Sequence, residues 1–187
     1  MKKLRVIAGI HKGRQLKAVP GKSTRPTTDK VKEAIFQRMG PFFDGGTFLD
    51  LFSGSGSLGI EALSRGMEFG IFVDKHPKAV QIINENLRLL KLENNAEVYR
   101  AEATRALQAT AKRNLKFDLL LLDPPYGKVD YGKILRECVE LDILNQSAII
   151  YCEHEPAEDI AYDPRDFTLL KEENYGGAIS ITILQKN

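Results

Sequence analysis

Four consecutive leucines, at positions 119–122, constrain the fold of this chain more than any other feature. An apolar run without alternation predicts a strand that is buried on both faces, which is typical of a parallel sheet covered by helices. The run leads directly into Asp123-Pro124-Pro125-Tyr126. Because open α/β sheets bind ligands at the carboxyl ends of their strands, a carboxylate and a stiff aromatic turn at this position indicate chemistry.

The sequence around this strand alternates predicted strands and helices from residue 47 onward. We expect parallel strands over residues 47–52, 69–74, 96–101, 119–122 and 147–152. The pattern is completed by a helix capped by Thr104 that runs to about Asn114, a short helix over residues 156–161 and a terminal hairpin over residues 167–184. Strand–helix alternation with right-handed crossovers predicts one mostly parallel α/β sheet, with strands one and four side by side in the order 3-2-1-4-5.

The first part of the chain differs in charge from the rest. Residues 1–40 hold eleven Lys and Arg against two acidic residues, a net charge of +9 that leaves −7 for the remainder. We therefore expect a basic extension over residues 1–45, a β-ribbon followed by a helix capped by Thr28 or Asp29, and a main domain over residues 46–187. The asymmetry favours a nucleic-acid partner over a merely solvated surface, with candidate contacts at Arg5, Lys12 and Arg14.

A glycine-rich loop follows the first predicted strand, where residues 50–59 read Asp-Leu-Phe-Ser-Gly-Ser-Gly-Ser-Leu-Gly. Its G-x-G-x-x-G spacing between a strand and a helix allows a ligand to approach the backbone closely, although a plain cluster of turn glycines is the alternative. A carboxylate repels a pyrophosphate, so Asp50 favours a ligand that carries an amino group or a sulfonium. The candidate cofactor contacts are Asp50, Phe52, Ser53, Gly54, Gly56 and Gly59.

Two further strand ends carry candidate cofactor contacts. Asp74 lies twenty residues after Gly54, the expected position for a carboxylate that accepts hydrogen bonds from both ribose hydroxyls, and Lys75 follows it. Glu102 and Ala103, after the third strand, are placed to meet an adenine edge. The structural alternatives are a simple turn aspartate and a solvated glutamate.

The residues after the leucine strand suit the activation of an exocyclic base amine. Such an amine is planar, and two fixed acceptors can hold its N–H bonds in the tetrahedral shape that a nucleophile needs. The Asp123 side chain and the Pro124 carbonyl are the candidates, Pro125 stiffens the turn, and the Tyr126 ring can stack on an extruded base. Catalysis would then be orientation plus electrostatics, unless the motif is only a proline-rich turn.

Together these stretches resemble class I S-adenosylmethionine (SAM)-dependent methyltransferases that act on amino groups. Nearly the whole chain resembles, more narrowly, the bacterial RsmD family, which methylates guanine N2 in 16S ribosomal RNA. The resemblance is carried by residues 5–9, 25–34, 50–56, 123–126 and by Tyr175-Gly176.

The resemblance implies a Rossmann-like, seven-stranded sheet in the order 3-2-1-4-5-7-6 with helices on both faces. It also implies SAM over residues 54–59, with its ribose at Asp74 and its adenine near Glu102, where the family commonly has Asp. Arg25 and Thr27 join the candidate RNA contacts. The alternatives are a DNA or RNA adenine-N6 methyltransferase, an NAD-binding oxidoreductase, and a non-catalytic RNA-binding relative.

The remaining sequence features concern metal binding, membrane insertion and the cellular compartment. The histidines do not converge, and the 152–155 segment Cys-Glu-His-Glu lacks zinc-ligand spacing, so we expect no metal. No apolar run approaches the roughly 20 residues of a membrane span, and two cysteines without paired spacing suit the cytoplasm. We expect a monomer that acts on 16S ribosomal RNA, either naked or within an assembling small subunit.

Overall fold

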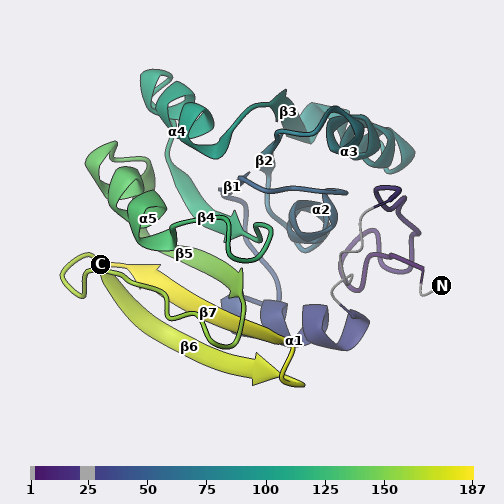
Figure 1. The fold of residues 1–187 in the computed structure, drawn as a ribbon. Helices are drawn as coiled ribbons and strands as arrows, with labels where there is room; N and C mark the ends of the chain where they lie inside the picture. The colour runs from purple at the N-terminus through teal and green to yellow at the C-terminus, as the bar shows by residue number, and fades with distance from the viewer. Residues whose placement is uncertain (1–2, 22–27) are drawn as a thin grey trace.

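The computed structural model describes residues 3–21 and 28–187 and shows one seven-stranded sheet between two layers of helices (Figure 1). The strand order, β3-β2-β1-β4-β5-β7-β6, confirms the predicted α/β topology. Strands β1 to β5 are parallel, and β7 runs antiparallel to both of its neighbours. The strands are β1 (Thr47–Asp50), β2 (Phe69–Asp74), β3 (Ala96–Arg100), β4 (Phe117–Leu122), β5 (Leu144–His154), β6 (Phe167–Tyr175) and β7 (Ile179–Lys186).

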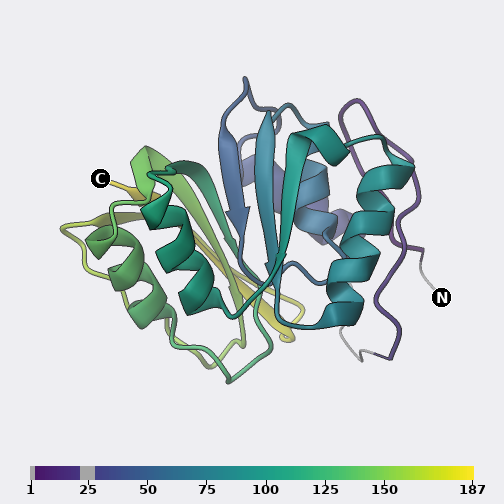
Figure 2. The same cartoon turned by 90° about the horizontal axis from the view of Figure 1, so that it is seen from above.

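Helices cover both faces of the sheet, as the view from above shows (Figure 2). One face carries α1 (Asp29–Met39), α2 (Ser57–Ser64) and α3 (Pro77–Leu89), and the other carries α4 (Ala103–Lys112) and α5 (Tyr131–Glu140). The leucine strand β4 lies between the two cores. Leu119 and Leu121 pack toward α1–α3, Leu120 and Leu122 pack toward α4 and α5, and all four are at most 1% exposed. This confirms the predicted burial on both faces.

Local sequence signals explain most of the element boundaries. Thr28 caps the N-terminus of α1, where its hydroxyl accepts a hydrogen bond from the Val31 N–H. Pro77 is the first residue of α3, a position at which its missing N–H costs nothing. Two expectations are wrong. Thr104 does not cap α4 but lies within its first turn, since the helix begins at Ala103 directly after Glu102. Residues 156–161 form a turn and irregular chain, because so short a segment cannot offset the cost of helix nucleation.

The N-terminal segment pairs with itself over a short stretch and docks on α2. The Leu16 N–H donates to the Leu4 carbonyl at 2.8 Å, and a single antiparallel bridge joins Arg5 and Gln15. The fully buried Glu61 of α2 accepts hydrogen bonds from the N–H groups of Ile7 and Ala8. The predicted domain boundary at residue 45 stays a prediction. The buried Glu61 carboxylate nevertheless joins the ribbon to α2 through these hydrogen bonds.

Helix α1 belongs to the same core as the sheet. Its residues Ile35, Phe36 and Met39 are buried in one cluster with Ile181 and Ile183 of β7. The described part of the chain contains no helix that is both long and apolar enough to cross a membrane.

Candidate active site

The glycine-rich loop leaves the sheet at a point fixed by Ser53. The Ser53 N–H donates to the Val73 carbonyl at 2.9 Å, and the Ser53 hydroxyl accepts from the Val73 N–H at 3.0 Å. The same hydroxyl donates to the Asp50 carbonyl at 2.9 Å. One buried serine therefore holds the ends of β1 and β2 together just before the glycines.

Each glycine of the loop has its own structural reason. Gly54 has φ of 56°, and a side chain there would meet no atom within 4 Å, so the loop is open on that side. Gly56 has φ of 83° and precedes α2 without a side-chain cap. Gly59 lets α2 approach the sheet, because a Cβ there would lie 2.4 Å from the Phe72 ring. The structure thus gives Gly59 a packing role, and its predicted cofactor contact stays a prediction.

Asp74 ties the end of β2 to the glycine loop. Its Oδ2 accepts from the Gly54 N–H at 2.9 Å, and its Oδ1 accepts from the His76 N–H at 2.9 Å. Each carboxylate oxygen retains acceptor capacity beyond one hydrogen bond. The predicted ribose contact is compatible with this geometry, and Lys75 beside it is exposed.

Asp50 is the most perturbed acid of the site. It ends β1 and is 1% exposed. Burial raises the pKa of its carboxyl to about 8, and repulsion from Asp74 adds to the rise. Within residues 3–21 and 28–187, neither carboxylate forms an ion pair with a Lys, Arg or His. A buried acidic pair beside an open glycine turn fits a ligand that combines a positive charge with hydroxyl groups, as SAM does.

The predicted adenine contacts follow β3, the edge strand that pairs with β2. Glu102 is exposed and precedes α4 without a hydrogen bond from its side chain to the helix, and Ala103 is half-buried. Phe52, between Asp50 and the glycines, is half-buried. These positions leave the three residues available to a ligand, and their contacts stay predictions.

The Asp-Pro-Pro-Tyr motif lies on the strand next to the glycine loop. Strands β1 and β4 pair directly, with Asp50 opposite Leu121, and the Leu51 N–H donates to the Leu121 carbonyl at 3.3 Å. Asp123 follows β4 at once and is half-buried. Both motifs therefore emerge at the same edge of the sheet, as expected at a switch point of strand order.

The residues that follow Asp123 in the motif differ in burial. Pro124 is buried, Pro125 is exposed, and 39% of the Tyr126 surface is exposed. Gly127, with φ of 68°, completes the turn. The exposed Tyr126 ring is accessible to a ligand, and the roles of Pro124 and Tyr126 stay predictions.

Sequence reasoning missed the polar residues at the end of β5. Tyr151 and Glu153 are buried there, and the Tyr151 hydroxyl lies 3.4 Å from Glu153 Oε1. The Tyr131 hydroxyl of α5 donates to the Glu153 carbonyl, and the His154 ring contacts Thr182 of β7. The local sequence of residues 152–155 gives no signal for this arrangement, because only the pairing of β5 with β4 brings Glu153 near the end of the leucine strand.

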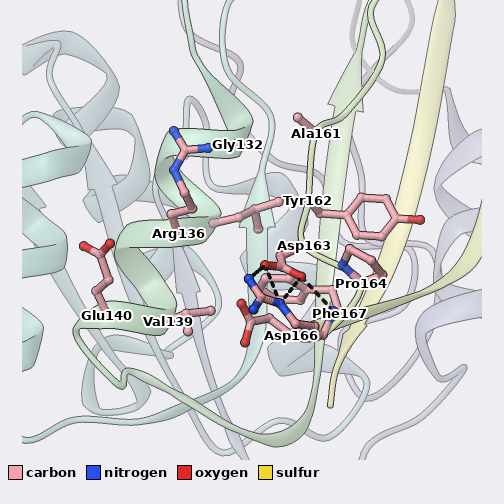
Figure 3. A pocket seen from close by; sticks show the side chains of 12 residues that line it. Gly132, Arg136, Val139, Glu140, Ala161, Tyr162, Asp163, Pro164, Asp166 and Phe167 are labelled. Atoms are coloured by element: carbon pink, nitrogen blue, oxygen red, sulfur yellow. Dashed lines mark hydrogen bonds and ion pairs between the residues drawn. The ribbon is translucent and has the colours of Figure 1, made fainter.

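A cavity of about 580 Å³ lies elsewhere, between α5 and residues 161–167 (Figure 3). Arg136 and Glu140 line it from the helix, and the ion pair between Asp163 and Arg165 lines it from the loop. None of the predicted site residues borders this cavity. The candidate site residues lie instead at the carboxyl ends of the strands.

The predicted RNA contacts divide into three groups. Arg5 is exposed but pairs with Asp29 at 2.7 Å, and Arg14 donates to the Leu89 carbonyl at 3.0 Å. Lys12 is exposed at the ribbon turn and forms no ion pair within the part of the chain that the structure describes. Arg25 and Thr27 lie outside the described residues.

Comparison with known proteins gives consistent results. A family model described as Conserved hypothetical protein 95 matches residues 4–184. The chain is 50% identical to the putative rRNA methyltransferase YlbH of Bacillus subtilis, over 92% of this chain and 94% of that one. It is 34% identical to ribosomal RNA small subunit methyltransferase D of Haemophilus influenzae, over 92% and 89%. A solved putative methyltransferase, yhhF from Escherichia coli, is 30% identical over 99% and 98%, with a TM-score of 0.84.

Proposed function

Because this chain belongs to the family described as Conserved hypothetical protein 95, the RsmD family, we propose that it methylates the exocyclic N2 amine of a guanine in 16S ribosomal RNA. The chain is a ribosomal RNA methyltransferase with a class I methyltransferase fold. The guanine, its N2 atom and the residues that act on it are the proposed refinements. We also propose that the protein acts in the cytoplasm, where ribosomal RNA is made in bacteria.

One observation carries this proposal: Asp123 and the glycine loop emerge from neighbouring parallel strands at one edge of the sheet. Methyl transfer needs donor and acceptor to be adjacent, and two motifs on paired strands supply that adjacency. Bound SAM supplies an activated methyl group at a sulfonium. The fit of Asp50, Asp74 and the open turn at Gly54 to such a ligand supports this donor.

The chain's own residues would hold and activate the amine. The Asp123 carboxylate and the Pro124 carbonyl accept hydrogen bonds from its two N–H groups, which holds the nitrogen near a tetrahedral shape and takes its lone pair out of conjugation with the ring. Tyr126 stacks on the base and Pro125 keeps the turn stiff. After transfer the nitrogen is positive and loses a proton readily, so Asp123 need only be close and well oriented.

Labelling of ribosomal RNA tests the proposed activity. We expect small-subunit RNA from a strain that lacks the gene to accept a tritiated methyl group from SAM in the presence of the purified protein, and mass spectrometry to identify the product as N2-methylguanosine. RNA from the parent strain, which is already methylated, is the matched control and should accept little label. A methylated adenine or cytosine as the sole product would overturn the guanine assignment.

Charge reversal on the ribbon tests the proposed RNA contact. We expect the triple change of Arg5, Lys12 and Arg14 to Glu to weaken binding of small-subunit RNA and to lower the slope of log affinity against log salt. Each lost phosphate contact should lower the slope by about 0.7 to 0.9, measured by filter binding across a salt series. Arg5 should contribute least, since Asp29 already neutralises it.

A matched control for the ribbon is Lys112→Glu. Lys112 is exposed in the last turn of α4, on the opposite face of the sheet. This change alters the net charge in the same direction but removes no proposed phosphate contact. If the ribbon variant keeps the salt slope of the wild type, or if Lys112→Glu lowers it equally, the RNA binds elsewhere.

A further inference from the structure

We propose that Glu153 accepts the N1–H of the target guanine and thereby distinguishes guanine from adenine. The inference rests on the proposed function, because it assigns a residue to the base that Asp123 and Pro124 present. The Asp-Pro-Pro-Tyr motif cannot make this distinction by itself, since guanine N2 and adenine N6 are both exocyclic amines with two N–H bonds.

The strand register brings Glu153 to the motif. Strands β4 and β5 pair in parallel, with Leu121 opposite Tyr151 and Leu122 opposite Cys152. Strand β4 ends at Leu122, and this register extended by one residue would put Asp123 opposite Glu153, with paired strands about 4.8 Å apart. Figure 1 shows the two strands side by side, with β5 between β4 and β7.

The electrostatic surroundings place the two carboxylates in one small region. Both Asp123 and Glu153 raise the pKa of the Tyr131 hydroxyl, and both raise that of the Tyr151 hydroxyl, in each case after the larger effect of burial. The hydroxyl groups of Tyr131 and Tyr151, which both lie beside Glu153, are therefore close enough to both acids to be affected by their charge. This agrees with the register, which is the geometric basis of the inference.

Glu153 is buried, held in place and without a cation. Its exposed fraction is 5%, and no Lys, Arg or His within residues 3–21 and 28–187 forms an ion pair with it. Its side chain meets the Tyr151 hydroxyl only at 3.4 Å, which is long for a hydrogen bond from a hydroxyl. A desolvated carboxylate in this state gains most from a further N–H donor.

The backbone at this point is fixed from two sides. The Tyr131 hydroxyl at the start of α5 donates to the Glu153 carbonyl. The neighbouring His154 ring contacts the Thr182 hydroxyl of β7 at 2.8 Å and the Glu155 carbonyl at 2.9 Å. A group that must read one edge of a base needs such support, because a loosely held acceptor discriminates poorly.

The chemistry of the bases then selects guanine. Guanine carries an N1–H donor directly beside the carbon that bears its N2 amine. Asp123 and the Pro124 carbonyl would accept from the amine, and a carboxylate beside Asp123 would accept from the N1–H. Adenine has a bare N1 acceptor beside its N6 amine, and cytosine has a bare N3 beside its N4 amine. Either base would set a lone pair against the buried Glu153, which is repulsive and leaves the carboxylate unsatisfied.

The test uses 2-aminopurine, which has the same amine as guanine but a bare N1. Semisynthetic small-subunit RNA carries either guanine or 2-aminopurine at the nucleotide identified by the labelling experiment. For the wild type we expect kcat/KM to be about 100-fold lower on 2-aminopurine. For Glu153→Gln we expect about a 10-fold loss on guanine, because the neutral Gln oxygen is a weaker acceptor than a carboxylate, and a gain on 2-aminopurine, because the Gln NH2 group can donate to the bare N1.

Within one variant, the ratio of kcat/KM on guanine to kcat/KM on 2-aminopurine does not depend on the fraction of the protein that is folded. SAM affinity and melting temperature are measured alongside, and Glu155→Gln, an exposed neighbour, should keep the wild-type ratio. An unchanged ratio in Glu153→Gln would overturn the inference and leave guanine methylation intact. Absence of any guanine product from the wild type would instead reject the proposed function itself.

Discussion

Asp123→Ala is expected to lower the rate of methyl transfer about 10³-fold or more while SAM affinity stays near that of the wild type. Asp123 provides one of the two acceptors proposed to hold the amine, and without it the nitrogen becomes planar again and its lone pair is delocalised into the ring. Removal of one preorganised electrostatic contact typically costs a factor of 10² to 10³, and lost orientation adds to it. Single-turnover rates with saturating RNA, together with calorimetric titration of SAM, measure the two effects separately.

Two further variants make the result specific. Asp123→Asn keeps one acceptor oxygen and should retain more activity than Asp123→Ala. Asp130→Ala removes a carboxylate seven positions away, whose role is to accept from the Lys133 N–H at the start of α5, so it should cost about 1 kcal/mol of stability and little activity. Wild-type rates in Asp123→Ala would disprove the acceptor role.

The separation of donor and acceptor residues follows from the topology. The glycine loop and Asp74 depend on β1 and β2, whereas Asp123 and Glu153 depend on β4 and β5. Each group of residues is held by its own strand pair, and β1 and β4 join the two. A change on the acceptor side can therefore remove chemistry without disturbing the contacts proposed for SAM.

The local sequence was sufficient to predict the sheet and both motifs. A strand that is buried on both faces must be apolar throughout, so residues 119–122 predicted a strand in the centre of the sheet. The glycine spacing predicted the ligand-binding loop after the first strand. The strand ends then converged because parallel strands share one carboxyl edge. The structure confirms the order of the five parallel strands that was expected from the strand–helix alternation, whereas the places of β7 and β6 had been implied by the family resemblance.

What the sequence left open depends on contacts between distant segments. The apolar stripe of α1 predicted a helix but could not show that Ile35 and Phe36 pack with β7. Charged residues are ordinarily expected at the surface, but three of them are buried beside the ribbon. Glu61 pairs there with Lys32 and with Arg65. Glu153 was missed for the same reason, since its meaning lies in the register of two strands and not in its neighbours along the chain.

Asp50→Asn is expected to stabilise the protein without ligand and to weaken SAM binding. The pKa of Asp50 rises from 3.8 to about 8 because of burial, with repulsion from Asp74 second. A folded-state pKa above the unfolded value gives a stabilising contribution that is full below about pH 4 and is lost as the pH rises through about 8. Asn cannot ionise, so the variant should be more stable than the wild type by about 2 to 4 kcal/mol at pH 9.

Urea unfolding at pH 5, 7 and 9 measures this effect. The wild type should lose stability across the series relative to Asp50→Asn, and the difference between the two proteins isolates Asp50 from the other titrating groups. SAM affinity should fall about 10- to 100-fold in the variant, because a charge-assisted hydrogen bond is lost. Asp118→Asn, at the opposite end of β4, where its carboxylate accepts from the Thr47 N–H, should keep SAM affinity.

The two halves of this prediction share one physical cause. A carboxylate that is 1% exposed, beside a second acid and without a cation in the described residues, is an unfavourable element of the ligand-free fold. A positively charged ligand relieves both the desolvation and the repulsion, so the same substitution improves the empty protein and damages the site. Parallel unfolding curves for wild type and variant would show that Asp50 does not ionise in this range, and its assignment to a cationic ligand would then have to be abandoned.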